Sequence, residues 1–117
     1  MLDHDHLDSP PPEISAALKV LSGKWTLMIL FQLSKRVSRF NELKRTIPGI
    51  TQHMLTTSLR ELEANDLVQR TIYAEVPPRV EYRMTQHGRS LKPVIEALAQ
   101  WGSFHLNRQK DKNADNH

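Results

Sequence analysis

The sequence of 117 residues contains no cysteine. This absence excludes disulfide bonds, thiolate metal sites, cysteine nucleophiles and thiol-based redox sensing. No apolar run reaches the roughly 18 residues that a transmembrane helix needs. The first residues, MLDHDHLDSPPPE, are acidic and rich in proline, unlike a secretory signal peptide. We therefore expect a cytoplasmic protein.

The sequence also lacks the patterns that carry catalysis. It has no nucleophile elbow, no phosphate-binding loop and no HExxH pair. Glu61 and Glu63 are two residues apart on an expected helix, so their side chains point in different directions. His4 and His6 lie on an arm without a ligand cluster, where we expect only adventitious metal binding. We expect no enzyme, no metal site and no cofactor.

Charge is unevenly distributed along the chain, although the formal net charge is only +3 at pH 7. Residues 1–17 contain four acidic residues and no lysine or arginine, whereas residues 18–107 contain 13 basic and 7 acidic residues. Five of the basic residues fall between Lys35 and Arg45, against one acid, Glu42. A basic body with an acidic arm favours a polyanionic partner such as a nucleic acid.

The length of the chain fits one domain with one modest core. We expect a flexible, acidic and proline-rich arm at 1–12, a folded domain at 13–107 and a polar, frayed tail at 108–117. The spacing of apolar residues predicts helices over about 13–21, 24–34, 40–46, 51–65 and 85–106. The second of these helices is apolar nearly all round and is expected in the centre of the core. Pro93 predicts either a kink in the last helix or a later start.

Two alternating segments, LVQRTIYAE and RVEYRMT, predict a β-hairpin. The residues expected on its core side are Val68, Ile72, Ala74, Val80, Tyr82 and Met84. The connection Val76-Pro77-Pro78 is expected to be stiff and exposed, because proline cannot extend a strand ladder. Two short helices joined by Pro48-Gly49 and followed by this hairpin predict a mainly α fold, a winged helix-turn-helix.

The helix expected over 51–65 has two contrasting sides. Leu55, Leu59 and Leu62 share one side at helical spacing and are expected to be buried. The opposite side carries hydrogen-bonding side chains without an acid: His53, Thr56, Thr57 and Arg60. Such a face is often merely solvated. Combined with the preceding turn, the hairpin and the cluster of basic residues, however, it favours a contact with DNA.

An α-helix fits the major groove of DNA, and side chains of its first turns reach base edges. The candidates for base readout are Gln52, His53, Thr56 and Thr57. The candidates for contacts with the DNA backbone are Arg36, Arg39, Lys44, Arg45, Thr51 and Arg60. Thr51 is also the expected N-cap of this helix. Arg79, after the two prolines of the hairpin, is the candidate wing contact with phosphate or a minor groove.

The first and last helices carry more apolar surface than one small core can bury. These residues are Ile14, Leu18 and Leu21 in the first helix and Leu91, Val94, Ile95, Leu98, Trp101 and Phe104 in the last. We expect them to form a homodimer interface, which would place two recognition helices about 34 Å apart on a pseudo-palindromic operator. The alternative is that the last helix folds back onto its own domain. A small apolar effector could bind near Trp25 or Trp101, but the sequence does not indicate its identity.

Four segments closely resemble the HxlR-type family of bacterial transcription regulators: LSGKWTLMILFQL, RFNELKRTIPGITQHMLTTSLRELEANDLVQR, YAEVPPRVEYRMTQHGRSL and WGSFH. The resemblance covers about residues 14–105, and the order of IPGI, MLT, LRELE and VPPRVEY is highly specific. It implies a winged-helix homodimer that binds an operator, in most cases as a repressor. The family's recognition helix corresponds to 51–65 and its wing to 73–81. Several members sense oxidants or aldehydes through a cysteine, which this chain lacks.

A second hypothesis comes from a different class of protein. A winged helix-turn-helix can also serve as a module that binds another protein, without specific DNA binding. That hypothesis predicts little effect of removing Arg60 or Arg79 and no strong dependence of binding on salt.

Overall fold

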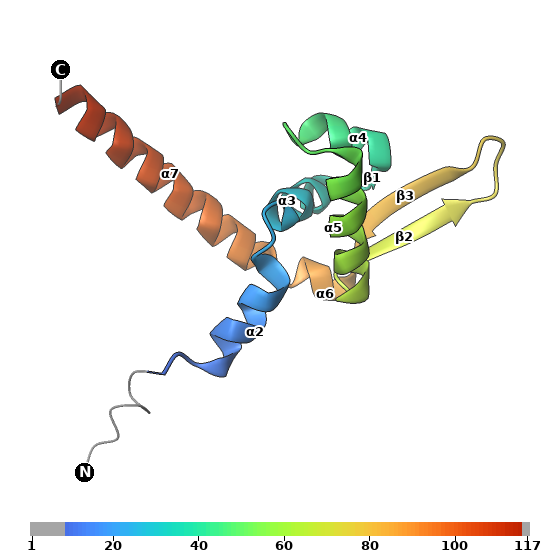
Figure 1. The fold of residues 1–117 in the computed structure, drawn as a ribbon, viewed down its shortest axis with the longest axis horizontal. Helices are drawn as coiled ribbons and strands as arrows, with labels where there is room; N and C mark the ends of the chain where they lie inside the picture. The colour runs from blue at the N-terminus through green and yellow to red at the C-terminus, as the bar shows by residue number, and fades with distance from the viewer. Residues whose placement is uncertain (1–8, 116–117) are drawn as a thin grey trace, which may run out of the picture.

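The chain divides into a head, which holds the small sheet and the helices around it, and the first and last helices, which project from the head (Figure 1). The structure is a computed structural model and describes residues 9–115. Its elements are α2 (Pro12–Leu21), α3 (Thr26–Lys35), β1 (Ser38–Arg39), α4 (Phe40–Thr46), α5 (Gln52–Ala64), β2 (Val68–Tyr73), β3 (Arg79–Met84), α6 (Gln86–Arg89) and α7 (Lys92–Asp115). The predicted fold, mainly α with a β-hairpin in a winged helix-turn-helix, is confirmed. The expected arm at 1–12 lies mostly outside the described residues.

The core of the head lies where α3, α4 and α5 meet the sheet. Ile29, Leu30, Leu43 and Leu55 are completely buried there, and Leu59 nearly so. Within α3 and α5 the buried residues recur at intervals of three or four positions, so each of these helices turns one face inward. Helix α3 supplies buried residues to the centre of the core, as expected, but Met28 and Phe31 on its other side are open to solvent.

The turn between α4 and α5 is set by two local features. Gly49 has a φ of 84°, in the left-handed region that favours glycine. Thr51 then caps α5, because its Oγ1 accepts a hydrogen bond from the backbone N–H of Met54 at 3.1 Å. The predicted cap is therefore confirmed, and it fixes where the first turn of α5 begins.

The sheet has the antiparallel strand order β1–β3–β2. Val68 pairs with Met84 and both are buried against the head, whereas Tyr73 pairs with Arg79 at the far end. Ile72 is 61% exposed and Ala74 is exposed as well, so the expectation that these two residues lie on the core side is wrong. The hairpin extends beyond the helices, and its outer half forms a projecting wing (Figure 1). Strand β1 was not expected, because two residues are too few to show an alternating pattern.

Helix α7 has the late start that was one of the two alternatives expected from Pro93, but it extends further than expected. Helix α7 starts at Lys92, so Pro93 lies in its first turn, where a missing N–H costs no hydrogen bond. The helix then continues to Asp115, so the expectation of a frayed tail is wrong for 108–115. Arginine, glutamine and lysine in this segment are good helix formers. Among residues 9–115, no single helix is long and apolar enough to cross a membrane, and α2 and α3 pass that test only as a pair bent by 77°.

Neither projecting helix has much of a core of its own. Helix α2 has no buried residue, and α7 has only Ile95. The radius of gyration is 18.4 Å, against about 13 Å for a compact domain of this length. Most large apolar residues of these two helices therefore face solvent within one chain.

Candidate nucleic-acid interface

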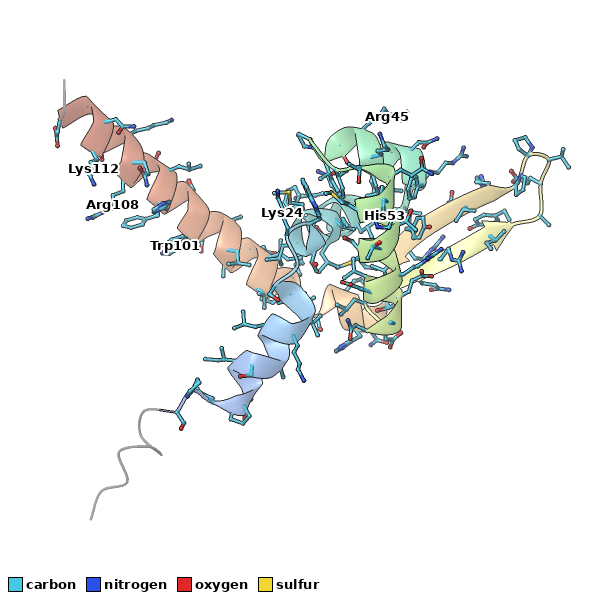
Figure 2. The ribbon with its side chains drawn as sticks, viewed as in Figure 1. Lys24, Arg45, His53, Trp101, Arg108 and Lys112 are labelled. Carbon is cyan, nitrogen blue, oxygen red and sulfur yellow. The ribbon has the colours of Figure 1, made fainter. Side chains whose placement is uncertain are left out.

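The polar side of α5 is open to solvent. Because Leu55, Leu59 and Leu62 hold the other side in the core, Gln52, His53 and Thr57 are exposed. Figure 2 shows His53 on α5, with Arg45 on the neighbouring helix α4. Three of the four predicted base-reading residues are therefore accessible, with His53 and Thr57 on the open side of α5 and Gln52 on its flank.

Two threonine hydroxyls near this face are used within the helix. Thr51 Oγ1 accepts the capping hydrogen bond, which leaves its own hydrogen available for a phosphate oxygen. Thr56 Oγ1 instead donates to the carbonyl oxygen of Gln52 at 2.8 Å. Thr56 is also partly buried, in a small cleft that it shares with Tyr82 of the sheet. Thr56 lies on the flank of α5, and the part of its side chain that remains free to contact a base is mainly the methyl group.

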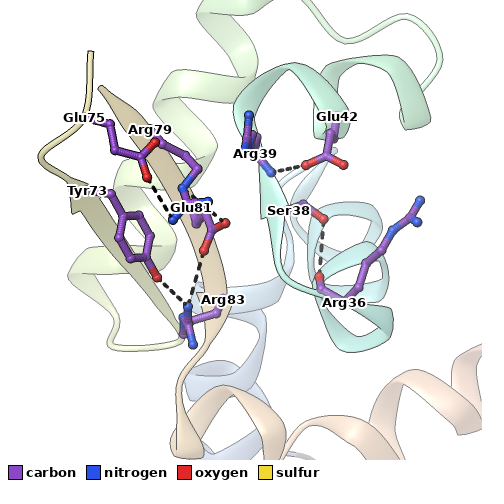
Figure 3. Close-up of polar contacts among 9 residues, drawn as sticks. All are labelled: Arg36, Ser38, Arg39, Glu42, Tyr73, Glu75, Arg79, Glu81 and Arg83. Atoms are coloured by element: carbon purple, nitrogen blue, oxygen red, sulfur yellow. Dashed lines mark hydrogen bonds and ion pairs between the residues drawn. The ribbon is translucent and has the colours of Figure 1, made fainter. Parts of the chain in front are cut away.

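Four of the predicted backbone contacts come from the segment between the end of α3 and the end of α4. Arg36, Arg39, Lys44 and Arg45 are all exposed. Glu42, the one acid of this stretch, accepts a hydrogen bond at 2.8 Å from the backbone N–H of Arg39, which begins α4 (Figure 3). A carboxylate at a helix N-terminus is favourably placed in the helix dipole. The negative charge of Glu42 therefore stabilises the start of α4 and is not paired with the basic side chains of this stretch.

Arg60 lies one turn further along α5 and is exposed. In the part of the chain that the structure describes, the ion pairs leave Arg60 without an acidic partner. Glu63, three residues further along the helix, pairs instead with Arg70 of β2 at 3.2 Å and ties α5 to the sheet. Burial raises the pKa of Tyr82, which lies beside this pair, above its ordinary value.

The predicted wing residue Arg79 is held by its neighbours (Figure 3). Its guanidinium lies 4.2 Å from the centre of the Tyr73 ring. Its Nη2 is 3.4 Å from Glu75 Oε1, and its Nε is 3.8 Å from Glu81 Oε2. Arg83 joins the same cluster, since its Nη2 is 3.5 Å from Glu81 Oε1 and donates to the Tyr73 hydroxyl at 3.3 Å. Sequence reasoning singled out Arg79 but missed the residues that surround it.

The expected dimer residues fall into two groups. Those open to solvent, called here the open apolar stripe, are Ile14, Leu18, Val94, Leu98, Trp101 and Phe104. Ile95 is buried in the core of its own chain, so the expectation that it belongs to the open surface is wrong. Leu21 and Leu91 are partly buried against the same core. Only the start of α7 contacts the head, because the helix leads away from it.

Helix α3 adds apolar surface that the sequence analysis missed. Met28 and Phe31 are exposed by 50% and 40% and line an apolar groove between α3 and α7. The groove includes Leu98 of the open apolar stripe and Ile47 beside the helix-turn-helix turn. This apolar surface is difficult to predict from the sequence, because apolar residues lie on every side of α3 and do not indicate which side is exposed. Trp25, in contrast, packs against the core.

No group of three or more histidine, aspartate or glutamate side chains that could hold a metal occurs within residues 9–115. His4 and His6 lie outside the described residues. His105 stacks on Trp101, with ring centres 5.0 Å apart, and so belongs to the surface of α7.

The helix-turn-helix, its open polar helix and the adjoining wing define the architecture of winged-helix transcription regulators. The sequence profile described as HxlR-like helix-turn-helix matches residues 20–110, and the chain belongs to this family. The family and its members are transcription regulators of the helix-turn-helix type.

Two relatives show how far the similarity extends. The HTH-type transcriptional regulator YtcD of Bacillus subtilis (strain 168) is 47% identical over 95 residues, which are 81% of this chain and 75% of the relative. An HTH-type transcriptional regulator of Methanothermobacter thermautotrophicus is 44% identical over 98 residues, 84% of this chain and 75% of the relative. The similarity thus covers the head and most of α7.

Solved structures agree with this assignment. The crystal structure of the HTH-type regulator ytcD covers 80% of this chain and 96% of its own with a TM-score of 0.78, at 47% identity. The redox regulator HypR in its reduced form covers 85% of this chain and 98% of its own with a TM-score of 0.80, at 39% identity. A chain without cysteine cannot use a thiol for redox sensing.

Proposed function

We propose that this chain is a homodimeric, sequence-specific DNA-binding repressor, with α5 in the major groove and the wing on the adjacent backbone or minor groove. The observation that carries the proposal is the open side of α5, where Gln52, His53 and Thr57 are exposed without an acidic side chain among them. A helix with such a face between exposed basic side chains fits a groove lined by phosphates.

The roles of the residues follow from their positions. Gln52 can pair with adenine through two hydrogen bonds, and the methyl groups of Thr56 and Thr57 can contact a thymine methyl. His53 reaches a base edge from the same face. The phosphate contacts are assigned to Arg36, Arg39, Lys44, Arg45, Thr51 and Arg60. These contacts fix the register of α5 in the groove, and the base contacts select the sequence.

The open apolar stripe supports a homodimer. A stripe this large on a protein of 117 residues is expected to be covered, and helices of a second copy have the same apolar character. Two copies related by a two-fold axis would read two half-sites about 34 Å apart. A dimer bound over a promoter would repress by excluding other proteins from it.

The first test is selection from a pool of genomic DNA fragments, with affinity measured over a series of salt concentrations. We expect an enriched palindromic site and a steep linear fall of log affinity with log salt concentration. A flat or undetectable response would contradict the proposal. It would favour the other class of protein, in which the polar side of α5 binds a protein partner.

The second test concerns base reading. Gln52→Ala should change the preferred base at one position of each half-site, because the amide that selects adenine is lost. The measurement is repeated selection with the variant, and Gln100→Ala on α7 is the matched control. An unchanged preference at every position would show that Gln52 is not a base reader.

A further inference from the structure

The basic residues of the head fall into two electrostatic groups. Those beside α5, such as Arg45 and Arg60, are exposed and make no ion pair within residues 9–115. Those of the wing, Arg79 and Arg83, pair with Glu75 and Glu81. The two positive and two negative charges of this cluster cancel. The wing therefore brings little net attraction to a phosphate backbone, although it carries two arginines.

The two glutamates hold the arginines in different ways. Glu81 lies between Arg79 and Arg83, contacts both, and is only 21% exposed. Glu75 contacts Arg79 alone and is 51% exposed, close to the tip of the wing (Figure 3). Tyr73 supports the guanidinium of Arg79 from its ring face. Glu81 and Tyr73 thus position Arg79, while Glu75 occupies the accessible end of its guanidinium.

We propose that Glu75 limits the affinity for DNA by competing with phosphate for the guanidinium of Arg79. The inference rests on the proposed function, since it concerns the strength of the same DNA contact. To reach a phosphate, Arg79 has to leave Glu75. The freed carboxylate then stays near the DNA backbone and repels it. The strength of the wing contact is therefore set by Glu75 as well as by Arg79.

The hydrogen bonding of the cluster favours such an exchange of partners. The Nε atoms of Arg79 and Arg83 are buried without a hydrogen-bond partner. A phosphate can accept two parallel hydrogen bonds from one guanidinium, whereas Glu75 makes one contact, with Nη2 of Arg79. The pair between Arg79 and Glu75 is exposed at its acidic end, and exposed pairs are weak. A phosphate can therefore displace Glu75 at modest cost.

The test is DNA affinity of Glu75→Gln over a salt series, measured on the site selected by the wild-type protein. We expect binding about two- to fivefold tighter at moderate salt, the size of an exposed ion pair. We also expect the slope of log affinity against log salt to become steeper by up to about 0.9, the value of one phosphate contact.

Two variants separate this effect from a general change of charge. Glu96→Gln adds the same charge to the protein on α7, away from the wing (Figure 1), and should leave affinity nearly unchanged. The double variant Glu75→Gln with Arg79→Ala should bind no more tightly than Arg79→Ala alone, because the gain needs the freed guanidinium.

The outcomes distinguish this inference from the proposed function. If the wild-type protein selects no DNA site, the proposed function fails. If the wild-type protein binds its site and Glu75→Gln binds it equally or more weakly, the role of Glu75 is overturned and the proposed function stands. The role of Glu75 is also overturned if Glu75→Gln still increases the DNA affinity when Arg79 is replaced by alanine. It is overturned as well if Glu96→Gln increases the affinity by the same factor.

Discussion

The head and helix α7 present leucine and aromatic residues at the same helical spacing, yet they bury them to very different extents. In α5, Leu55, Leu59 and Leu62 are each exposed by no more than 1%. In α7, Trp101 is exposed by 62% and Phe104 by 64%. Both rows lie on one side of a helix. The difference is that α5 faces α3 and the sheet, whereas most of α7 faces no other element of its chain (Figure 1).

The comparison separates two requirements of the molecule. The head buries its core leucine residues within one chain and exposes a polar, mostly basic surface to which a partner can bind. The projecting helices leave the open apolar stripe exposed to solvent within one chain. The first surface suits a polyanion and the second suits another copy of the chain. Four predictions test this separation, from the largest expected effect to the smallest.

The largest effect is expected from a pair of leucine variants. Leu59→Ala should lower the free energy of unfolding by about 2–5 kcal/mol, because it leaves a cavity in the head. Leu106→Ala on α7 should cost less than about 0.5 kcal/mol, since Leu106 is 64% exposed. Urea unfolding at one fixed protein concentration measures both. Equal losses would show that α7 is as deeply buried as the head.

A second pair compares two sides of α7. Trp101→Glu should weaken dimerisation by about 30-fold or more, the loss expected for an interface side chain that contributes about 2 kcal/mol. Leu106→Glu is the matched control: its leucine is similarly exposed but lies about 140° round the helix. Sedimentation equilibrium measures both dissociation constants. If the two variants dissociate equally, the open apolar stripe is not the interface.

A third pair compares basic residues of the two regions. Arg60→Ala should weaken DNA binding about tenfold or less for all sequences alike and reduce the salt slope by about 0.9, because one phosphate contact is lost. Lys110→Ala removes the same charge from α7 and should change neither quantity by much. Fluorescence anisotropy with a labelled operator over a salt series gives both values. A similar loss in both variants would mean that only the net charge matters.

The smallest effect concerns pH and the base of the wing. Burial raises the pKa of Tyr82 above its ordinary value of 10.0; Glu63 also raises it, while Arg70 and Arg60 lower it. Because the unfolded tyrosine ionises first, the stability from the neutral hydroxyl is full below about pH 10 and is lost as pH rises further. Unfolding midpoints from about pH 9 to 11 should therefore fall more steeply for the wild type than for Tyr82→Phe. Parallel profiles would rule out this contribution.

Much of the head could be predicted from the sequence. Apolar residues three and four apart indicated α3, α4 and α5, and Pro48-Gly49 with Thr51 indicated the turn and the cap. Alternation indicated the hairpin. Strand β1 was missed because two residues show no period. The end of α7 was missed because a polar helix that nothing covers has no apolar pattern to mark it.

The candidate site was only partly predictable. The spacing within α5 indicated which side chains share its polar side, and the structure leaves three of the four proposed base readers exposed there. The cluster around Arg79 was missed, although alternate residues of RVEYR place Arg79, Glu81 and Arg83 on one face of β3. The contribution of Tyr73 needed the pairing with Arg79 across the hairpin, which no pattern within one strand shows.

The sequence by itself determined the local arrangement of side chains: which residues share a side of α5, where the helix begins, and that the chain has no thiol for redox sensing. Helical and strand periods are properties of neighbouring residues, so they can be derived from order alone. Only the tertiary structure decided that Ile95 is buried while Trp101 is open. It also decided that, within residues 9–115, Arg60 makes no ion pair while Arg79 is held by two glutamates. Burial and ion pairing depend on which distant segments meet, and the packing of the whole chain sets those contacts.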